Sequence, residues 1–243
     1  MTALIGYCFE DGAFLAADTQ RILNKPGSSN YWAHFEVSKI SKLYENIGFA
    51  TCGVPVDEAK LSLQMKIKPE STKNEVTTLA CKIYGDLLKP VSDIETNLVI
   101  FGTDNENGCG FIRRLEWDSA KKEFEIEDYK MGSFFADGFI PLNYEMYAES
   151  NLKKAFAPRI NGLQLDYWAE LMLADIVNWA SSNDIVEEYG VNPVDFPIDC
   201  LVFRKHKTPF YKRVLKPSPM LSEYIQSKFI EDNFTLKKKP SSQ

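Results

Sequence analysis

Apolar residues in the first half of the chain come in short runs separated by polar turns, a pattern typical of β-strands. The first two runs, 3–9 and 13–18, are joined by Glu10-Asp11-Gly12, which predicts a β-hairpin. Residues 24–30 are polar and contain glycine, which indicates a loop. The same pattern predicts further strands at 39–43, 47–53, 98–102, 111–117 and 124–129, and a closing strand pair at 200–203 and 209–211.

Helical spacing of apolar residues appears in four places. Two helices are predicted at about 55–68 and 74–88, with Pro69 as the break between them. A wide apolar stripe predicts a long helix at about 164–182, and its aromatic residues suit a core better than a cofactor site. A further amphipathic helix is predicted after Pro217. Strands and helices in this order favour antiparallel sheets covered by helices over a doubly wound parallel sheet.

Composition limits the class of protein. The 243 residues suit one large domain, expected at 2–216, followed by a helix and a disordered basic tail at 217–243. The net charge of −6 argues against a nucleic acid or an anionic membrane as the main partner. We find no secretory signal and no apolar run of membrane-spanning length, so a cytoplasmic protein is expected.

Cysteine and histidine are poorly placed for metal or triad chemistry. The five cysteines are scattered, which predicts reduced packing residues and not disulfides. The two histidines, His34 and His206, are isolated, so neither a zinc site nor a Ser-His-Asp or Cys-His mechanism is expected. The sequence therefore predicts a protein without a metal or other cofactor.

Thr2 carries the most specific chemical possibility. A threonine that becomes the first residue after removal of Met1 has both a hydroxyl nucleophile and an α-amine base. A free α-amine titrates at about 7.7–8.0, so it is partly unprotonated near neutral pH. A nearby lysine ammonium would lower that pKa further, and a paired carboxylate would hold the lysine charged.

An ordered set of pieces in the first 55 residues resembles the proteasome β-type subunits, which are N-terminal-nucleophile hydrolases. The pieces are Thr2, the hairpin Asp11-Gly12, Leu15-Ala16-Ala17-Asp18-Thr19, Val37-Ser38-Lys39-Ile40 and Ala50-Thr51-Cys52-Gly53. Their spacing is family-like, with Asp18 sixteen residues after Thr2 and Gly53 fourteen after Lys39. The later layout of strands and helices is also similar, but the motifs themselves cover only the first quarter of the chain.

The resemblance implies a role for each of six candidate catalytic residues. Thr2 would be the nucleophile, Lys39 and Asp18 its charged partners, and the Gly53 N–H an oxyanion donor. Ser133 would help to move a proton through water, and Asp184 matches an aspartate that follows the family's long helix. Lys42 is a rival for the role of Lys39. The residues expected to line the substrate pocket are Arg21, Val37, Thr51 and Pro55, and an Arg21 that faces the pocket would favour acidic substrates.

The sequence departs from the family pattern at two points. Bulky Phe134 and Phe135 follow Gly132-Ser133 where small residues are usual, and the segment 184–196 is longer and more acidic than expected.

The resemblance also implies a fold and a function. The fold would be α+β, a four-layer αββα sandwich of two antiparallel sheets flanked by helices. The function would be that of a threonine peptidase that cleaves peptides or unfolded proteins inside a homo-oligomeric ring, with a possible ATPase activator. Two alternatives stay open: an amidase of the same superfamily acting on a small amide, and an inactive structural protein that keeps the fold.

Overall fold

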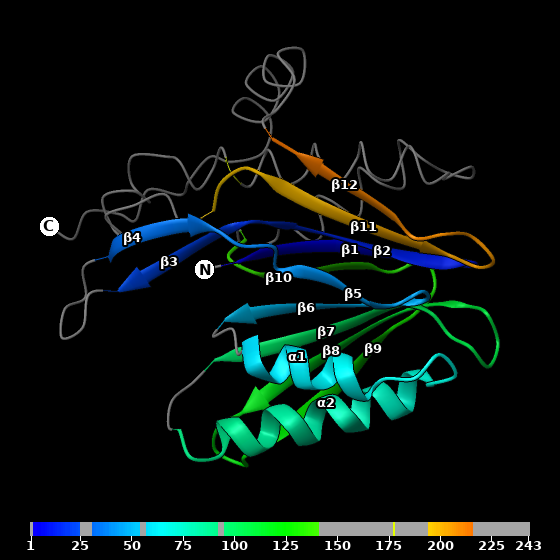
Figure 1. Ribbon diagram of the computed structural model, residues 1–243, viewed down its shortest axis with the longest axis horizontal. Coiled ribbons are helices and arrows are strands. Elements are labelled where there is room, and N and C mark those ends of the chain that lie inside the picture. The colour runs from blue at the N-terminus through cyan, green and yellow to red at the C-terminus, as the bar shows by residue number, and fades with distance from the viewer. Residues whose placement is uncertain are drawn as a thin grey trace, which may run out of the picture.

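The computed structural model describes residues 2–24, 31–53, 57–91, 95–140, 177 and 194–215. These residues form twelve strands and two helices (Figure 1). The strands are β1 (Ala3–Phe9), β2 (Gly12–Asp18), β3 (Gln20–Asn24), β4 (Tyr31–Glu36), β5 (Ile40–Tyr44), β6 (Ile47–Gly53), β7 (Thr96–Thr103), β8 (Gly110–Asp118), β9 (Glu123–Tyr129), β10 (Phe134–Gly138), β11 (Ile198–Arg204) and β12 (Phe210–Val214). The helices are α1 (Asp57–Lys66) and α2 (Lys73–Leu88).

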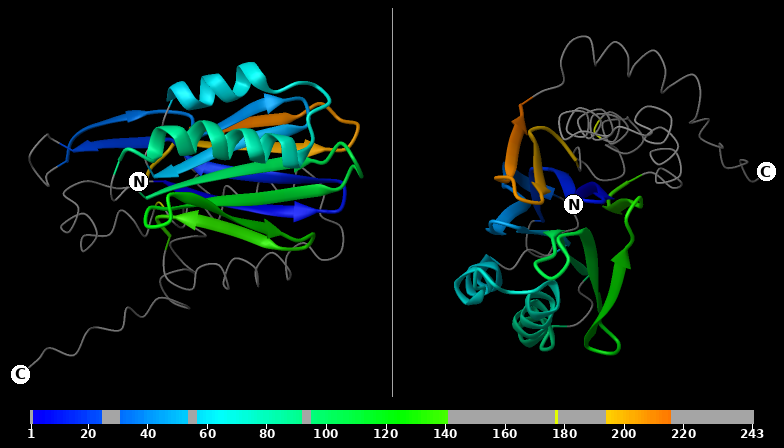
Figure 2. Two further views of the ribbon diagram at one scale, coloured as in Figure 1. Left: turned by 90° about the horizontal axis from the view of Figure 1, so that it is seen from below. Right: turned by 90° about the vertical axis from the view of Figure 1, so that its right-hand side faces the viewer.

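Two antiparallel five-stranded sheets lie face to face (Figures 1 and 2). The first sheet has the order β10-β1-β2-β11-β12, and the second has the order β5-β6-β7-β8-β9. Strands β3 and β4 form a separate two-stranded ribbon. Since β10 and β2 flank β1 on either side, residues far apart in the sequence meet at the start of β1.

Side chains that alternate along β7 explain how the layers hold together. Val99 and Phe101 belong to the core between the two sheets, whereas Leu98 and Ile100 pack beneath α1 and α2. The core between the sheets also includes Leu4, Leu15, Ile112, Phe135, Leu201 and Phe203. The second sheet is therefore buried on both faces at its centre, which is why residues 98–101 of its middle strand are all apolar.

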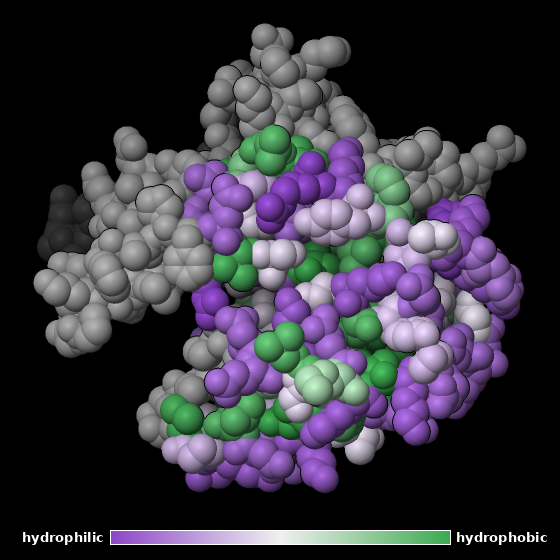
Figure 3. Space-filling view, in the orientation of Figure 1, coloured by the Kyte–Doolittle hydropathy of each residue, from purple (hydrophilic) through white to green (hydrophobic). Residues whose placement is uncertain are grey.

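Both predicted helices of the first half are confirmed: α1 is slightly shorter than predicted, and α2 begins one residue earlier. Helix α2 begins with a capping box, in which Thr72 and Glu75 each accept a hydrogen bond from the other's backbone N–H. Neither described helix is long and apolar enough to cross a membrane. The described surface seen in Figure 3 is mainly hydrophilic, with small separate apolar areas.

The predicted four-layer αββα sandwich is wrong. The described chain is mostly antiparallel sheet, and its two helices, α1 and α2, both lie on the outer face of the second sheet (Figures 1 and 2). The sandwich was implied by the resemblance, and a helical stripe was predicted at 164–182. That stripe falls outside the described residues apart from Val177.

The sequence reading also missed the ribbon of β3 and β4. No strand was predicted on either side of the 24–30 loop, where β3 and β4 pair from Gln20 with Glu36 to Asn24 with Tyr31. Residues 25–30 lie outside the described chain, as do the predicted helix and tail beyond residue 216.

Candidate functional site

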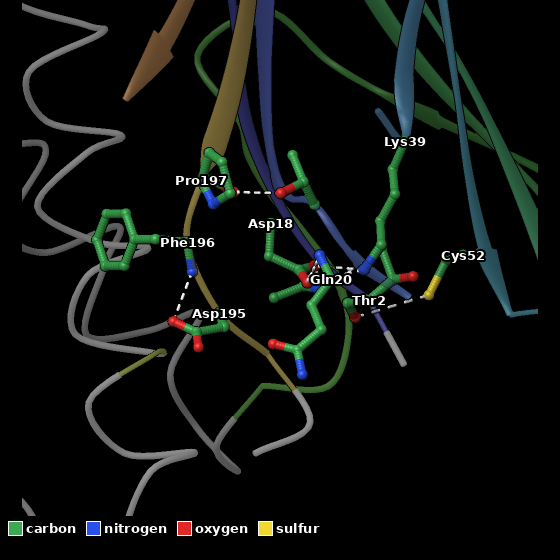
Figure 4. A network of polar contacts seen from close by, with 10 residues as sticks. Thr2, Asp18, Gln20, Lys39, Cys52, Asp195, Phe196 and Pro197 are labelled. Carbon is green, nitrogen blue, oxygen red and sulfur yellow. Dashed lines mark hydrogen bonds and ion pairs between the residues drawn. The ribbon is translucent and has the colours of Figure 1, made fainter. Parts of the chain in front are cut away.

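Thr2 lies at the start of β1, where the first sheet faces the second (Figure 4). The residue is buried, with 4% of its surface exposed. Its carbonyl oxygen accepts a hydrogen bond of 2.7 Å from the Phe139 N–H. The Cys52 thiol donates to the same oxygen at 3.9 Å. The backbone of Thr2 is therefore held from both sheets.

A buried ion pair lies next to Thr2. The Lys39 Nζ donates to both carboxylate oxygens of Asp18, at 2.8 and 2.7 Å. Asp18 ends β2 and is fully buried, and the Lys39 side chain is 8% exposed. Asp18 also accepts the backbone N–H of Ala3 at 2.8 Å and that of Gln20 at 3.1 Å. The carboxylate thus fixes both the lysine and the residue that follows Thr2 (Figure 4).

Burial and pairing act in opposite directions on this pair. Burial raises the pKa of Asp18 and lowers the pKa of Lys39, because each charged form loses its hydration. The mutual charge attraction and hydrogen bonds oppose both shifts. The pairing with Asp18 therefore favours the charged form of Lys39 against the effect of its burial.

A second set of bonds holds the end of β2 in place. The Thr19 N–H and hydroxyl both donate to the carbonyl oxygen of Pro197, at 3.0 and 2.9 Å. The carbonyl oxygen of Thr19 accepts the Val37 N–H at 2.8 Å. These bonds join β2 to the segments that lead into β11 and β5, so the positions of Asp18 and Lys39 depend on three distant parts of the chain (Figure 4).

A cavity of about 380 Å³ opens beside Thr2. Its lining residues are Thr2, Cys52, Gly53, Glu95, Thr96, Asn97, Asp137, Gly138 and Phe139. Gly53 has φ +95°, and a Cβ there would lie 2.1 Å from the carbonyl oxygen of Glu95. Gly138 has φ +89°, and a Cβ there would lie 2.0 Å from the carbonyl oxygen of Thr2. Both wall positions therefore require glycine.

Four of the predicted catalytic residues come together in this region. Thr2 and Gly53 line the cavity, and Lys39 and Asp18 form the ion pair beside Thr2. The rival Lys42 lies elsewhere, since its exposed side chain pairs with Glu45 at 2.6 Å. Lys39, and not Lys42, therefore contacts Asp18.

Ser133 does not join the site. Its carbonyl oxygen accepts the Cys8 N–H, at the opposite end of β1 from Thr2. Cys8 is six positions along the strand, about 20 Å at the usual rise per residue. Because β10 runs antiparallel to β1, the end of β10 at Gly138 lies beside Thr2, and the start after Ser133 does not. The position of Ser133 therefore does not match the role that the resemblance implies for it.

Of the described residues predicted to bind substrate, only Thr51 adjoins a residue that lines the cavity. Arg21 Nη1 pairs with Asp57 at 3.4 Å, and neither Arg21 nor Val37 is among the lining residues. Thr51 lies one strand position from the lining residue Cys52, and its N–H donates to the Lys39 carbonyl oxygen at 3.4 Å. Pro55 and Asp184 fall outside the described residues.

Sequence reasoning missed the wall formed by Asn97, Asp137 and Gly138. The Asn97 Nδ2 donates to both oxygens of Asp137, at 3.1 and 3.0 Å, and the Gly138 N–H adds a third bond at 2.8 Å. Burial raises the pKa of Asp137. The available signal was the dipeptide Asp-Gly after an apolar run, which marks the end of a strand where a polar side chain can face a cavity.

Cys52 is unsuited to be the nucleophile, because burial raises the pKa of its thiol to about 12 and the thiolate is scarce at neutral pH. Within the described ranges, no group of three or more histidine, cysteine, aspartate or glutamate side chains could hold a metal ion. Comparison of the chain with protein-family models and with curated proteins found no match.

Proposed function

We propose that the protein is a hydrolase of amide bonds that uses Thr2, after removal of Met1, as an N-terminal nucleophile. The observation that carries the proposal is the contact of Lys39 with both oxygens of Asp18, whose carboxylate also binds the N–H next to Thr2. A buried ion pair is costly to form, so its presence beside a nucleophile candidate favours a chemical role.

In the proposed reaction, the Thr2 hydroxyl attacks the carbonyl carbon of the substrate, and the Thr2 α-amine takes the hydroxyl proton. The Gly53 N–H stabilises the negative charge that develops on the carbonyl oxygen. The amine then returns the proton to the leaving nitrogen as the C–N bond breaks. Water hydrolyses the threonine ester that remains, which releases the acid and restores the Thr2 hydroxyl.

Lys39 would assist this sequence electrostatically. Its positive charge lowers the pKa of the nearby Thr2 amine, so that more of the amine is unprotonated and able to act as a base. Asp18 holds the Lys39 ammonium through two hydrogen bonds and keeps it from turning toward solvent.

The larger assembly is part of the same proposal. The resemblance to proteasome β-type subunits favours a cytoplasmic threonine peptidase whose copies form a ring, with peptides or unfolded proteins as substrates and an ATPase as a possible activator. The cavity volume favours a second candidate, an amidase for small substrates, because about 380 Å³ lies at the low end of ordinary ligand sites. Size-exclusion chromatography with electron microscopy separates the two, since a ring supports the peptidase and a monomer or dimer the amidase.

Intact mass spectrometry is the first test of the mechanism. Loss of the Met1 mass and a single covalent adduct with a threonine-directed β-lactone support the proposal. Thr2→Ala should abolish the adduct and the turnover of fluorogenic amides, and Thr2→Ser should retain part of both. Thr78→Ala, on the exposed surface of α2, is the matched control and should behave as wild type. Complete retention of Met1, or full activity in Thr2→Ala, would refute the proposed function.

A further inference from the structure

The wall of the cavity next to Thr2 carries a buried carboxylate that the proposed mechanism does not use. Asp137 lies directly opposite Leu4 in the pairing of β10 with β1, and Thr2 is two positions before Leu4. Residues two apart on a strand share a face, so Asp137 and Thr2 face the same side of the first sheet. Both line the cavity, and only 8% of Asp137 is exposed.

Asp137 is held rigidly but retains room for one more partner. Asn97 and the Gly138 N–H supply three hydrogen bonds, two to Oδ1 and one to Oδ2. An ionised carboxylate offers about four acceptor positions, so Oδ2 has capacity left. The Asn97 amide and the Gly138 N–H hold the Asp137 carboxylate in place. The carboxylate is therefore preorganised to accept a hydrogen bond from a donor in the cavity.

The charges around the cavity favour a cation. Glu95 adds a second carboxylate to the lining, and no lysine or arginine is among the described lining residues. The charge of Arg114 opposes the rise in the pKa of Asp137, and Arg114 also pairs with Glu116 at 2.6 Å and Glu127 at 3.4 Å. The cation Lys39 is bound to Asp18. Arg21, which was expected to attract acidic substrates, pairs with Asp57.

We propose that the cavity selects substrates with a cationic nitrogen close to the amide bond that Thr2 attacks, and that Asp137 is the specificity residue that binds this nitrogen. The inference rests on the proposed function, because it assumes that the attacked carbonyl lies between Thr2 and Gly53. Two sources share this chemistry: a lysine or arginine side chain on the acyl side of the bond, and the free α-amine of a substrate's first residue.

Matched aminomethylcoumarin amides test the preference. Acetyl-lysyl and acetyl-norleucyl substrates differ mainly in the charge of the side chain, and the acetyl-glutamyl substrate carries the opposite charge. Alanyl and acetyl-alanyl substrates test the free α-amine. We expect kcat/KM to be about tenfold higher for the cationic member of at least one pair. This effect is larger than that of an exposed charge pair and smaller than that of a fully buried one. The glutamyl substrate should be the poorest, and added salt should reduce the preference.

Asp137→Asn removes the charge while keeping the shape, and it should bring the cationic-to-neutral ratio close to one. Asp86→Asn, on the exposed surface of α2, is the matched control and should leave the ratio unchanged. If wild type hydrolyses neutral and cationic substrates equally, the specificity proposal fails while the proposed function stands. If Asp137→Asn keeps the full ratio, Asp137 is the wrong residue. Because the wild-type ratios need no variant, the test holds even if Asp137→Asn does not fold. If wild type cleaves none of these amides and forms no Thr2 adduct, both proposals fail.

Discussion

Replacing Lys39 with methionine removes the cation that faces the fully buried carboxylate of Asp18. Methionine has a similar length, so the change tests the charge more than the packing. Asp18 would lose two of its four hydrogen bonds and keep those from the Ala3 and Gln20 N–H groups. The carboxylate would then be buried without a counter-ion.

The size of the effect follows from that burial. Breaking a buried ion pair by removing one partner costs about 3–5 kcal/mol, mainly because the other charge stays uncompensated. For a domain of about 150–250 residues, each kcal/mol shifts the melting temperature by about 2–4 °C. Lys39→Met should therefore lower the melting temperature by roughly 6–20 °C.

Thermal unfolding followed by circular dichroism measures this shift. Lys42→Met is the matched control, because Lys42 is three residues away and pairs on the exposed surface with Glu45. Its expected loss is about 0.5 kcal/mol or less. The double variant Asp18→Asn/Lys39→Met should recover much of the stability lost in the single variant, because the uncompensated charge is gone.

The pH dependence gives an independent check. In Lys39→Met the folded-state pKa of Asp18 lies above its unfolded value of about 3.9, because burial is no longer opposed by the lysine. Protonated Asp18 is then the more stable form, so the deficit should be smallest below about pH 4 and should grow as pH rises through the folded pKa. A single variant that melts like Lys42→Met, or a deficit that is constant with pH, would refute the reasoning.

Two further predictions concern glycine geometry and the ion pair between Arg113 of β8 and Asp128 of β9. Gly132→Ala should cost about 1–2 kcal/mol for its φ of +84° alone, since no atom of the described residues lies within 4 Å of the added Cβ. Gly138→Ala should cost at least about 1–3 kcal/mol more and reduce activity, because its Cβ would collide with the carbonyl of Thr2; equal melting temperatures of the two variants would contradict this. Arg113 holds the pKa of Asp128 below its usual range through two hydrogen bonds, so Asp128→Asn should lose up to about 1 kcal/mol above pH 4. That loss should shrink as pH falls through the folded pKa of Asp128, and chemical denaturation at pH 7 and pH 3 measures both values.

Local patterns in the sequence were sufficient for most of the described elements. The β1–β2 hairpin, strand β6 and helix α2 each follow from a short apolar run bounded by turn or cap residues, so local sequence determines them. The candidates Thr2, Asp18, Lys39 and Gly53 were predicted from a resemblance in order and spacing to the proteasome β-type subunits.

Strand order was not readable in the same way. The distance of Ser133 from Thr2 depends on the direction in which β10 pairs with β1, and a run of five residues carries no record of its partner. The carboxylate of Asp137 was missed for the same reason. The four-layer sandwich was wrong because the two described helices, α1 and α2, both pack on the second sheet.

The sequence by itself therefore determined most of the strands and both helices of the described chain, and it predicted Thr2 as a candidate nucleophile. Only the tertiary structure decided that Lys39 and not Lys42 meets Asp18, that Gly138 and not Ser133 adjoins Thr2, and that the cavity wall is acidic. The physical reason is that periodicity and turn chemistry act over a few residues. Contacts between strands, by contrast, are set by burial summed over the whole sheet.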